Sequence, residues 1–231
     1  MPRVREPLSR DRVLAAAIRL ADTEGLAALT MRRLAGDLGV EAMSLYHHLP
    51  GKEALLDGLV EAVLAEIDDA IARAERESAA RGWRGTIRRR FLSARTAMIR
   101  HPWAPGLIAS RSTIPAPLYA YYDAILATLI QAGFSYHLAH RALHAFGSMA
   151  LGYSQEIFTP ATEGGATDME LSEAELAAMA DALPHLTAMV DAEVHASNGD
   201  TLGWCDSQSE FEFTLDLLLD GLERARRKTP T

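Results

Sequence analysis

The sequence has a single cysteine, few aromatic residues and no long uninterrupted apolar run. Cys205 alone cannot build a disulfide framework or a multi-cysteine metal site. No apolar run reaches the roughly 20 residues that span a bilayer, and no apolar signal core follows the first basic residues. A phosphate-binding glycine loop, a nucleophile elbow and a zinc-protease motif are also missing. We therefore expect a cytoplasmic, non-enzymatic protein without membrane association, cofactor or bound metal.

Alternating runs of β-branched residues, which would indicate strands, are absent as well. Alanine and leucine instead repeat at helical spacing, which predicts an all-α protein. The first part of the chain shows three short helices, over about 10–24, 30–37 and 41–49, and a long helix begins at Lys52. Further helices are expected over about 84–101, 117–132, 135–158 and 209–228.

The charge is uneven along the chain. The net charge of −8 argues against a nucleic-acid partner, because phosphate binding depends on Lys and Arg. Residues 1–52, however, hold eight Lys/Arg against six Asp/Glu, so the acidic excess lies in the remainder. This asymmetry favours a DNA-binding head on an acidic body.

Residues 30–49 have the pattern of two short helices joined by a tight turn. Thr30 is a good N-cap and Gly39 supplies the stop between the helices. Leu34, Leu38, Val40, Leu45 and Leu49 can face inward, against the preceding helix. This geometry projects a recognition helix into the major groove of DNA. The residues left facing outward are Arg32, Arg33, Ala42, Met43, Ser44, Tyr46, His47 and His48.

The run T-M-R-R-L-A-G-D-L-G-V-E-A-M-S-L-Y-H-H-L-P-G-K-E-A-L-L, residues 30–56, resembles the DNA-binding segment of the tetracycline-repressor (TetR) family. The resemblance implies a DNA-binding domain over 1–52 and a larger helical bundle over 53–231, connected by a helix over about 53–76. It also implies a homodimeric regulator, expected to be a repressor, that reads a palindromic operator and responds to a small molecule. Arg32 would reach a base edge, Ala42, Met43 and Ser44 would lie over the bases, and Tyr46, His48 and Lys52 would hold phosphates.

The family resemblance further implies an effector pocket inside each body. Apolar and aromatic side chains there suit a small, largely apolar molecule. His101 matches the position at which the tetracycline repressor uses histidine on a drug-bound magnesium ion. Ile87 and Ile125 stand near the places of that site's other partners, which argues against tetracycline. The candidate pocket residues are Phe91, Met98, His101, Trp103, Ile125, Leu129, Phe146, Met149 and Tyr153.

In this family, the last helices form the dimer interface. The candidates are His140, His144, Phe211, Leu215, Leu218 and Leu222. The spacing of His137, His140 and His144 on one helical face also allows a metal site, although an exposed or interface cluster is the preferred interpretation. An enzyme and a helical adaptor are the rival functions, and a transcriptional activator stays open beside a repressor.

Overall fold

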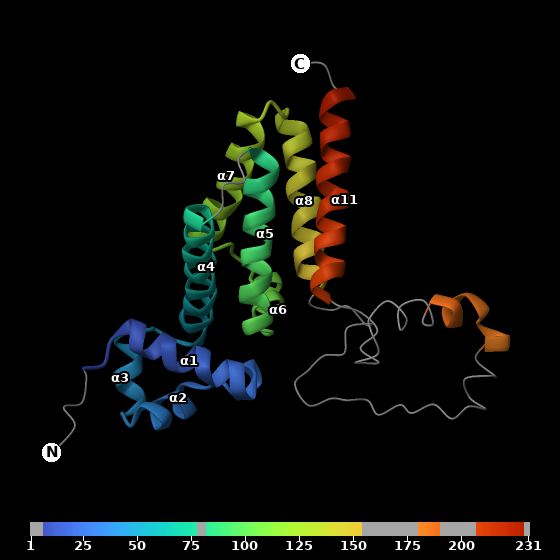
Figure 1. The fold of residues 1–231 in the computed structure, drawn as a ribbon. Coiled ribbons are helices and arrows are strands. Elements are labelled where there is room, and N and C mark those ends of the chain that lie inside the picture. The colour runs from blue at the N-terminus through green and yellow to red at the C-terminus, as the bar shows by residue number, and fades with distance from the viewer. Residues whose placement is uncertain (1–6, 78–81, 154–179, 190–206, 229–231) are drawn as a thin grey trace. The chain divides into compact units, whose positions relative to one another are not determined.

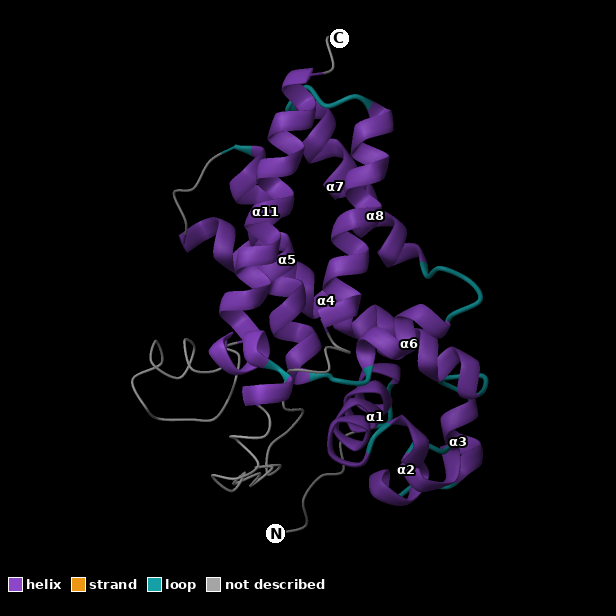
Figure 2. Cartoon of the chain, turned by 90° about the vertical axis from the view of Figure 1, so that its right-hand side faces the viewer, coloured by secondary structure: helices purple, strands orange, loops and turns teal. Residues whose placement is uncertain are grey.

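The computed structural model describes residues 7–77, 82–153, 180–189 and 207–228. All regular elements in these ranges are helices, which confirms the all-α prediction (Figures 1 and 2). The described residues up to 153 and those from 218 to 228 belong to one compact unit, and the described residues between 180 and 217 belong to a second. No helix in the described ranges is long and apolar enough to cross a membrane.

The helices follow the expected order. Residues 154–158 of the helix expected over 135–158 lie outside the described residues, and the last helix begins two residues before its predicted start. The elements are α1 (Arg10–Glu24), the 3-10 turn η1 (Leu26–Ala28), α2 (Met31–Leu38), α3 (Ala42–Tyr46), α4 (Lys52–Glu77), α5 (Trp83–Arg100), α6 (Ala104–Ser110), α7 (Ala116–Gln131), α8 (Tyr136–Gly152) and α11 (Ser207–Lys228).

The first three helices, which we call the head, are bounded by local capping interactions. The Ser9 side chain accepts a hydrogen bond from the Arg12 backbone N–H at 3.2 Å, and Thr30 does the same for Arg33 at 3.1 Å. These bonds satisfy N–H groups that lack a partner within the first helical turn. Gly39 ends α2 in the left-handed region at φ 65°. The predicted caps and the predicted stop are therefore present.

A small apolar core fixes α2 and α3 against α1. Leu34, Leu45 and Leu49 are buried as predicted, whereas Leu38 and Val40 are only half-buried. Helix α3 is shorter than the predicted 41–49, because the chain turns after Tyr46. The turn still buries Leu49, whose N–H donates to the Leu45 carbonyl at 2.9 Å.

The long helix α4 connects the head to the remaining helices, which we call the body. It packs against α1 on the head side and against α5, α6 and α7 in the body (Figure 1). Its crossing with α1 lies at Gly58, where an added Cβ would stand only 2.6 Å from a methyl group of Leu14. The absence of a side chain at Gly58 thus permits the close approach of α1 and α4.

Gly36, within α2, and Gly39, which follows the last residue of α2, give a matched test of the turn between α2 and α3. Gly39→Ala should lower the free energy of unfolding by about 1–2 kcal/mol, because a Cβ is unfavourable at a positive φ. Gly36→Ala should be neutral or stabilise by up to about 1 kcal/mol, since Gly36 is helical and its Cβ would meet nothing within 4 Å. Urea-induced unfolding measures both variants. Equal effects of the two substitutions would contradict the requirement for glycine at the turn.

Candidate functional site

The head presents the predicted outward-facing residues around α3. Met43 and Tyr46 are 70% and 43% exposed, and His47 is exposed as well. Ala42, Ser44 and His48 are partly exposed. Their helix is held from behind by the buried Leu45, so these side chains belong to a fixed surface.

Two basic residues extend this surface, and a third is engaged within the head. Arg32 and Lys52 are exposed and form no ion pair among the described residues. Arg33 instead donates to both carboxylate oxygens of Glu24 at 2.6 and 3.0 Å, and its Nε donates to Asp37 at 3.2 Å. The structure therefore favours a bracing role for Arg33, between α1 and α2, over the predicted contact with DNA.

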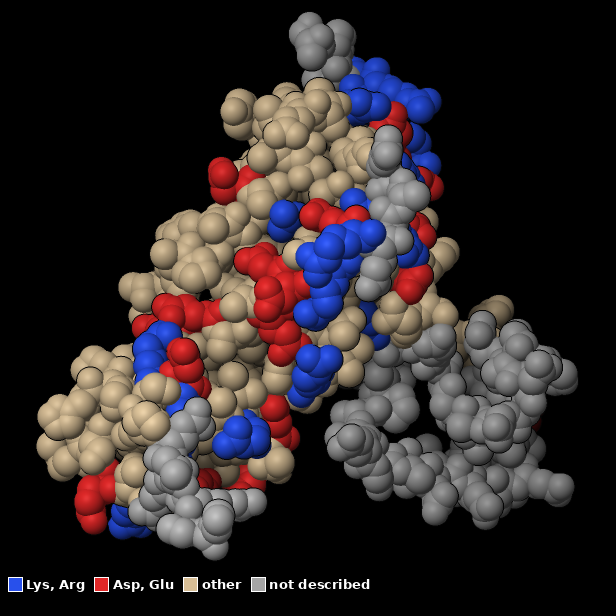
Figure 3. All heavy atoms as spheres, turned by 60° about the vertical axis from the view of Figure 1, so that its left-hand side comes forward, with Lys and Arg blue, Asp and Glu red and all other residues tan. Residues whose placement is uncertain are grey.

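Other basic side chains of the described helices also form ion pairs with acidic side chains. Figure 3 shows a face on which Lys and Arg side chains lie beside Asp and Glu. Arg10 pairs with Glu61 at 2.6 Å, and Arg100 pairs with Glu66. These two basic side chains are thus paired with the protein's own carboxylates.

A buried histidine joins the head to the body. His101 is 4% exposed; its Nδ1 lies 2.7 Å from Asp22 of α1, and its Nε2 lies 3.1 Å from Glu66 of α4. The Trp103 indole N–H also donates to Asp22, at 2.7 Å. Ionised carboxylates only accept hydrogen bonds, so the ring satisfies both when each of its nitrogens carries a proton. His101 and Trp103 thus form a polar junction, and neither is among the residues that line the apolar pocket described below.

A second ionic connection lies at the other end of α6. Arg111, which follows α6, pairs with Glu53 at 2.8 Å and with Asp57 at 2.7 Å, both on the first turns of α4. The Arg111 side chain is 9% exposed. Residues flanking α6 therefore hold α4 at two separated points.

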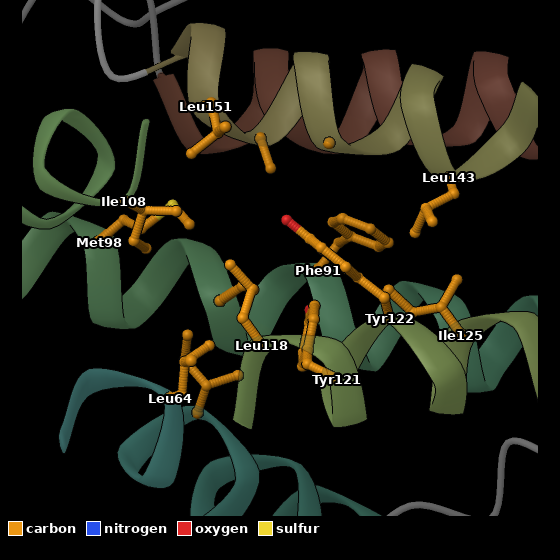
Figure 4. A pocket seen from close by; sticks show the side chains of 14 residues that line it. Leu64, Phe91, Met98, Ile108, Leu118, Tyr121, Tyr122, Ile125, Leu143 and Leu151 are labelled. Carbon is orange, nitrogen blue, oxygen red and sulfur yellow. The ribbon is translucent and has the colours of Figure 1, made fainter. Parts of the chain in front are cut away.

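The body contains a partly open apolar pocket lined by residues of α4, α5, α6, α7 and α8. Its volume is about 60 Å³. Most of its walls are aliphatic, and the aromatic side chains are one phenylalanine and two tyrosines (Figure 4). The lining residues are Leu64, Ile67, Phe91, Ala94, Met98, Ile108, Leu118, Tyr121, Tyr122, Ile125, Leu143, Gly147, Ala150 and Leu151.

Only part of the predicted pocket set lines this cavity. Phe91, Met98 and Ile125 do so. Phe146 is fully buried behind Phe91, with ring centroids 4.9 Å apart, and thus shapes the wall without facing the cavity. The remaining predicted residues that do not line it are Leu129 and Met149, both buried, and Tyr153, whose ring lies 5.8 Å from the Arg95 guanidinium.

The candidate dimer residues divide between exposed and buried positions. His140 and His144 are exposed on α8, and their Nε2 atoms are 3.1 Å apart. Phe211 and Leu215 of α11 are buried in the single chain, which removes them from a surface available to a partner. Leu218 and Leu222 are half-buried, while Phe213 and Leu217 are 61% and 52% exposed. The described residues contain no group of three or more His, Cys, Asp or Glu placed to hold a metal ion.

Comparison with known proteins identifies the class. Residues 13–59 match the family described as bacterial regulatory proteins, tetR family, and residues 77–226 match the tetracyclin repressor-like C-terminal domain. These matches cover more than half of the chain, which therefore belongs to the TetR family of transcriptional regulators.

Individual relatives agree with this assignment along most of their length. The chain is 32% identical to the tetracycline repressor protein class C of Escherichia coli, over 96% of this chain and 94% of that protein. It is 28% identical to the HTH-type transcriptional repressor DrrR1 of Streptomyces coeruleorubidus, over 94% of this chain and 77% of that protein. The crystal structure of a possible TetR family regulator from Streptomyces coelicolor A3(2) superposes with a TM-score of 0.71 at 29% identity, covering 94% of this chain and all of that one.

The junction histidine gives a stability test. His101→Ala should lower the free energy of unfolding by roughly 1–3 kcal/mol, because it leaves two carboxylates and a packed site without their partner. The matched control is His47→Ala, an exposed histidine of the head that is not a dimer-interface candidate, which should change it by less than about 0.5 kcal/mol. Both are measured by urea-induced unfolding. If the two variants unfold alike, His101 does not carry the junction.

Proposed function

We propose that the protein is a homodimeric repressor that binds a palindromic operator through its heads and is released by a small, largely apolar effector. It acts by binding alone, without catalysis. The observation that carries this proposal is the position of α4, which packs against α1 of the head and lines the body pocket with Leu64 and Ile67. A molecule in the pocket thus contacts the same helix that supports the head.

The chemistry of the head surface suits major-groove DNA. The Arg32 guanidinium can donate two hydrogen bonds to a guanine edge, and Ala42 and Met43 can contact a thymine methyl group. Ser44 lies beside them and can bond to a base edge. Tyr46, His48 and Lys52 carry groups that bind phosphate oxygens, which position the helix on the duplex. His47 is exposed next to them at the end of α3.

In the proposed mechanism, the operator is released because the pocket is too small to admit an effector without a movement of its walls. Its volume of about 60 Å³ is well below the roughly 150 Å³ of an engineered cavity that binds benzene. A ring-sized effector therefore has to move a wall, and Ile108 places one wall on α6. Since α6 is flanked by Arg111 and His101, its displacement pulls on α4 and on α1. The effector must bind the displaced state more tightly for this to release DNA.

Dimerisation would use the exposed faces of the last helices. On α8 the exposed set includes Tyr136, which is 76% exposed, and the pair His140 and His144. On α11 the exposed apolar side chains are Phe213 and Leu217. They replace the buried Phe211 and Leu215 as candidates, while Leu218 and Leu222 stay at the edge of the available surface. Two heads in a dimer would read half-sites about one helical turn apart.

The first experiment is protection of the DNA that flanks the protein's own gene, followed by titration of the protected site. Arg32→Ala and Tyr46→Ala should each weaken binding, Arg32→Ala by about 1–3 kcal/mol for each base contact that it removes. Arg73→Ala is the matched control, because it removes an equal charge from the exposed surface of α4 outside the head. No protection at low salt there or in a genome-wide selection, or equal losses of affinity for Arg32→Ala and Arg73→Ala, would overturn the proposal.

Salt dependence separates the phosphate contacts from the base contacts. Lys52→Ala should weaken binding similarly on all sequences and reduce the slope of log affinity against log salt by about 1 for each half-site. Arg32→Ala should instead relax the preference at one base position. Titrations between 50 and roughly 200 mM salt measure the slopes. An unchanged slope for Lys52→Ala would show that its ammonium group does not contact phosphate.

A further inference from the structure

The pocket wall carries few polar side-chain groups. No charged side chain and no side-chain amide lies among the 14 residues that form it. The polar side-chain groups that it contains are the hydroxyls of Tyr121 and Tyr122, neighbours on α7. These two hydroxyls therefore decide which polar group of a bound molecule the pocket can recognise.

The two tyrosines differ in how far their hydrogen bonds are satisfied. The Tyr121 hydroxyl donates to the Arg90 carbonyl at 3.4 Å, and the Arg90 guanidinium lies 5.7 Å from its ring. The Tyr122 hydroxyl has no hydrogen-bond partner in the part of the chain that the structure describes. Figure 4 shows the Tyr122 side chain crossing the pocket with its oxygen directed into the middle. Tyr122 is half-buried, and its hydroxyl is thus a donor that a molecule in the pocket can reach.

Burial raises the pKa of the Tyr122 hydroxyl above its ordinary value of 10.0. The hydroxyl therefore keeps its proton throughout the physiological pH range and stays available as a hydrogen-bond donor. An occupant that covers this hydroxyl without supplying an acceptor leaves the donor unpaired, so an occupant that supplies an acceptor gains more than one that supplies only apolar surface.

We propose that Tyr122 determines the specificity of the pocket, which takes a neutral, largely apolar ring compound with one carbonyl oxygen that accepts from Tyr122. This inference rests on the proposed function, because it names the chemical class of the effector. A carbonyl matches this donor without adding a proton that needs an acceptor of its own, whereas a ligand hydroxyl adds one. A charged ligand is excluded by the cost of burying an ion among apolar side chains without a counter-charge.

The test uses two bicyclic probes that share one skeleton. Tetralin is a hydrocarbon, and 1-tetralone has a carbonyl in place of one methylene group. A third probe, 1,2,3,4-tetrahydro-1-naphthoate, adds a negative charge to that skeleton. Equilibrium dialysis measures the binding of each probe to the full-length wild-type protein and to Tyr122→Phe. Tyr119→Phe is the matched control, because Tyr119 lies on the same helix but is 58% exposed and outside the pocket.

The expected result is a preference that depends on one hydroxyl. Wild type and Tyr119→Phe should bind 1-tetralone about three- to tenfold more tightly than tetralin, the range expected for one net hydrogen bond. Tyr122→Phe should abolish this preference without weakening the binding of tetralin. The naphthoate should bind more weakly than either neutral probe. Each of four results would overturn the proposal. Wild type could bind tetralin and 1-tetralone equally, or Tyr122→Phe could lose affinity for both neutral probes in parallel. The naphthoate could bind most tightly, or 1-tetralone could fail to bind.

A spectroscopic measurement reports the hydrogen bond directly. Prodan is a neutral naphthyl ketone whose emission moves to longer wavelength when its carbonyl accepts a hydrogen bond. Bound prodan should emit at shorter wavelength in Tyr122→Phe than in wild type or Tyr119→Phe, and identical emission from all three proteins would count against the proposal. Operator titration of the same preparations separates the two conclusions. If wild type binds the operator but does not prefer 1-tetralone to tetralin, only the assignment of the effector class is refuted. If wild type does not bind the operator, the proposed function is refuted.

Discussion

The packing of α4 is the constraint on which the head and the body both depend. This one helix buries Leu55 and Leu59 near the head and Leu64, Ile67 and Ile71 farther along, so it has little free surface to adjust. At Gly58 the approach to α1 is so close that a Cβ would force the Leu14 side chain to move. A helix of 26 residues is stiff over its roughly 39 Å length, so a shift imposed at the pocket appears at the head.

Ion pairs around α6 define where such a shift is transmitted. His101 connects α1 and α4 through two carboxylates, and Arg111 connects the loop after α6 to the start of α4. Exposed ion pairs contribute little to stability, but the Arg111 guanidinium is itself buried, so breaking its pairs leaves a poorly solvated charge. Such ion pairs are either formed or broken, which favours two discrete arrangements over a continuous deformation.

The features predicted correctly from sequence are those that local chemistry decides. The caps at Ser9 and Thr30 and the turn at Gly39 depend on neighbours within four residues, and the outward face of α3 follows from helical spacing. The errors arise where a distant element decides. Arg33 is occupied by Glu24 of the preceding helix, and His101 turns toward Asp22 instead of the pocket. Tyr122 was missed because periodicity alone could not show which face of α7 meets the cavity.

The weak charge of the head bears on how release can work. With Arg33 braced internally, few free cations remain on each head, so a single head has limited affinity for phosphate. In the proposed dimer, tight binding then depends on both heads engaging together, since the second contact is made at high effective concentration. A change in head spacing removes that advantage without altering any DNA-contacting residue. In the proposed mechanism, a modest displacement at α6 would therefore suffice to free the operator, whereas a strongly basic head would resist release.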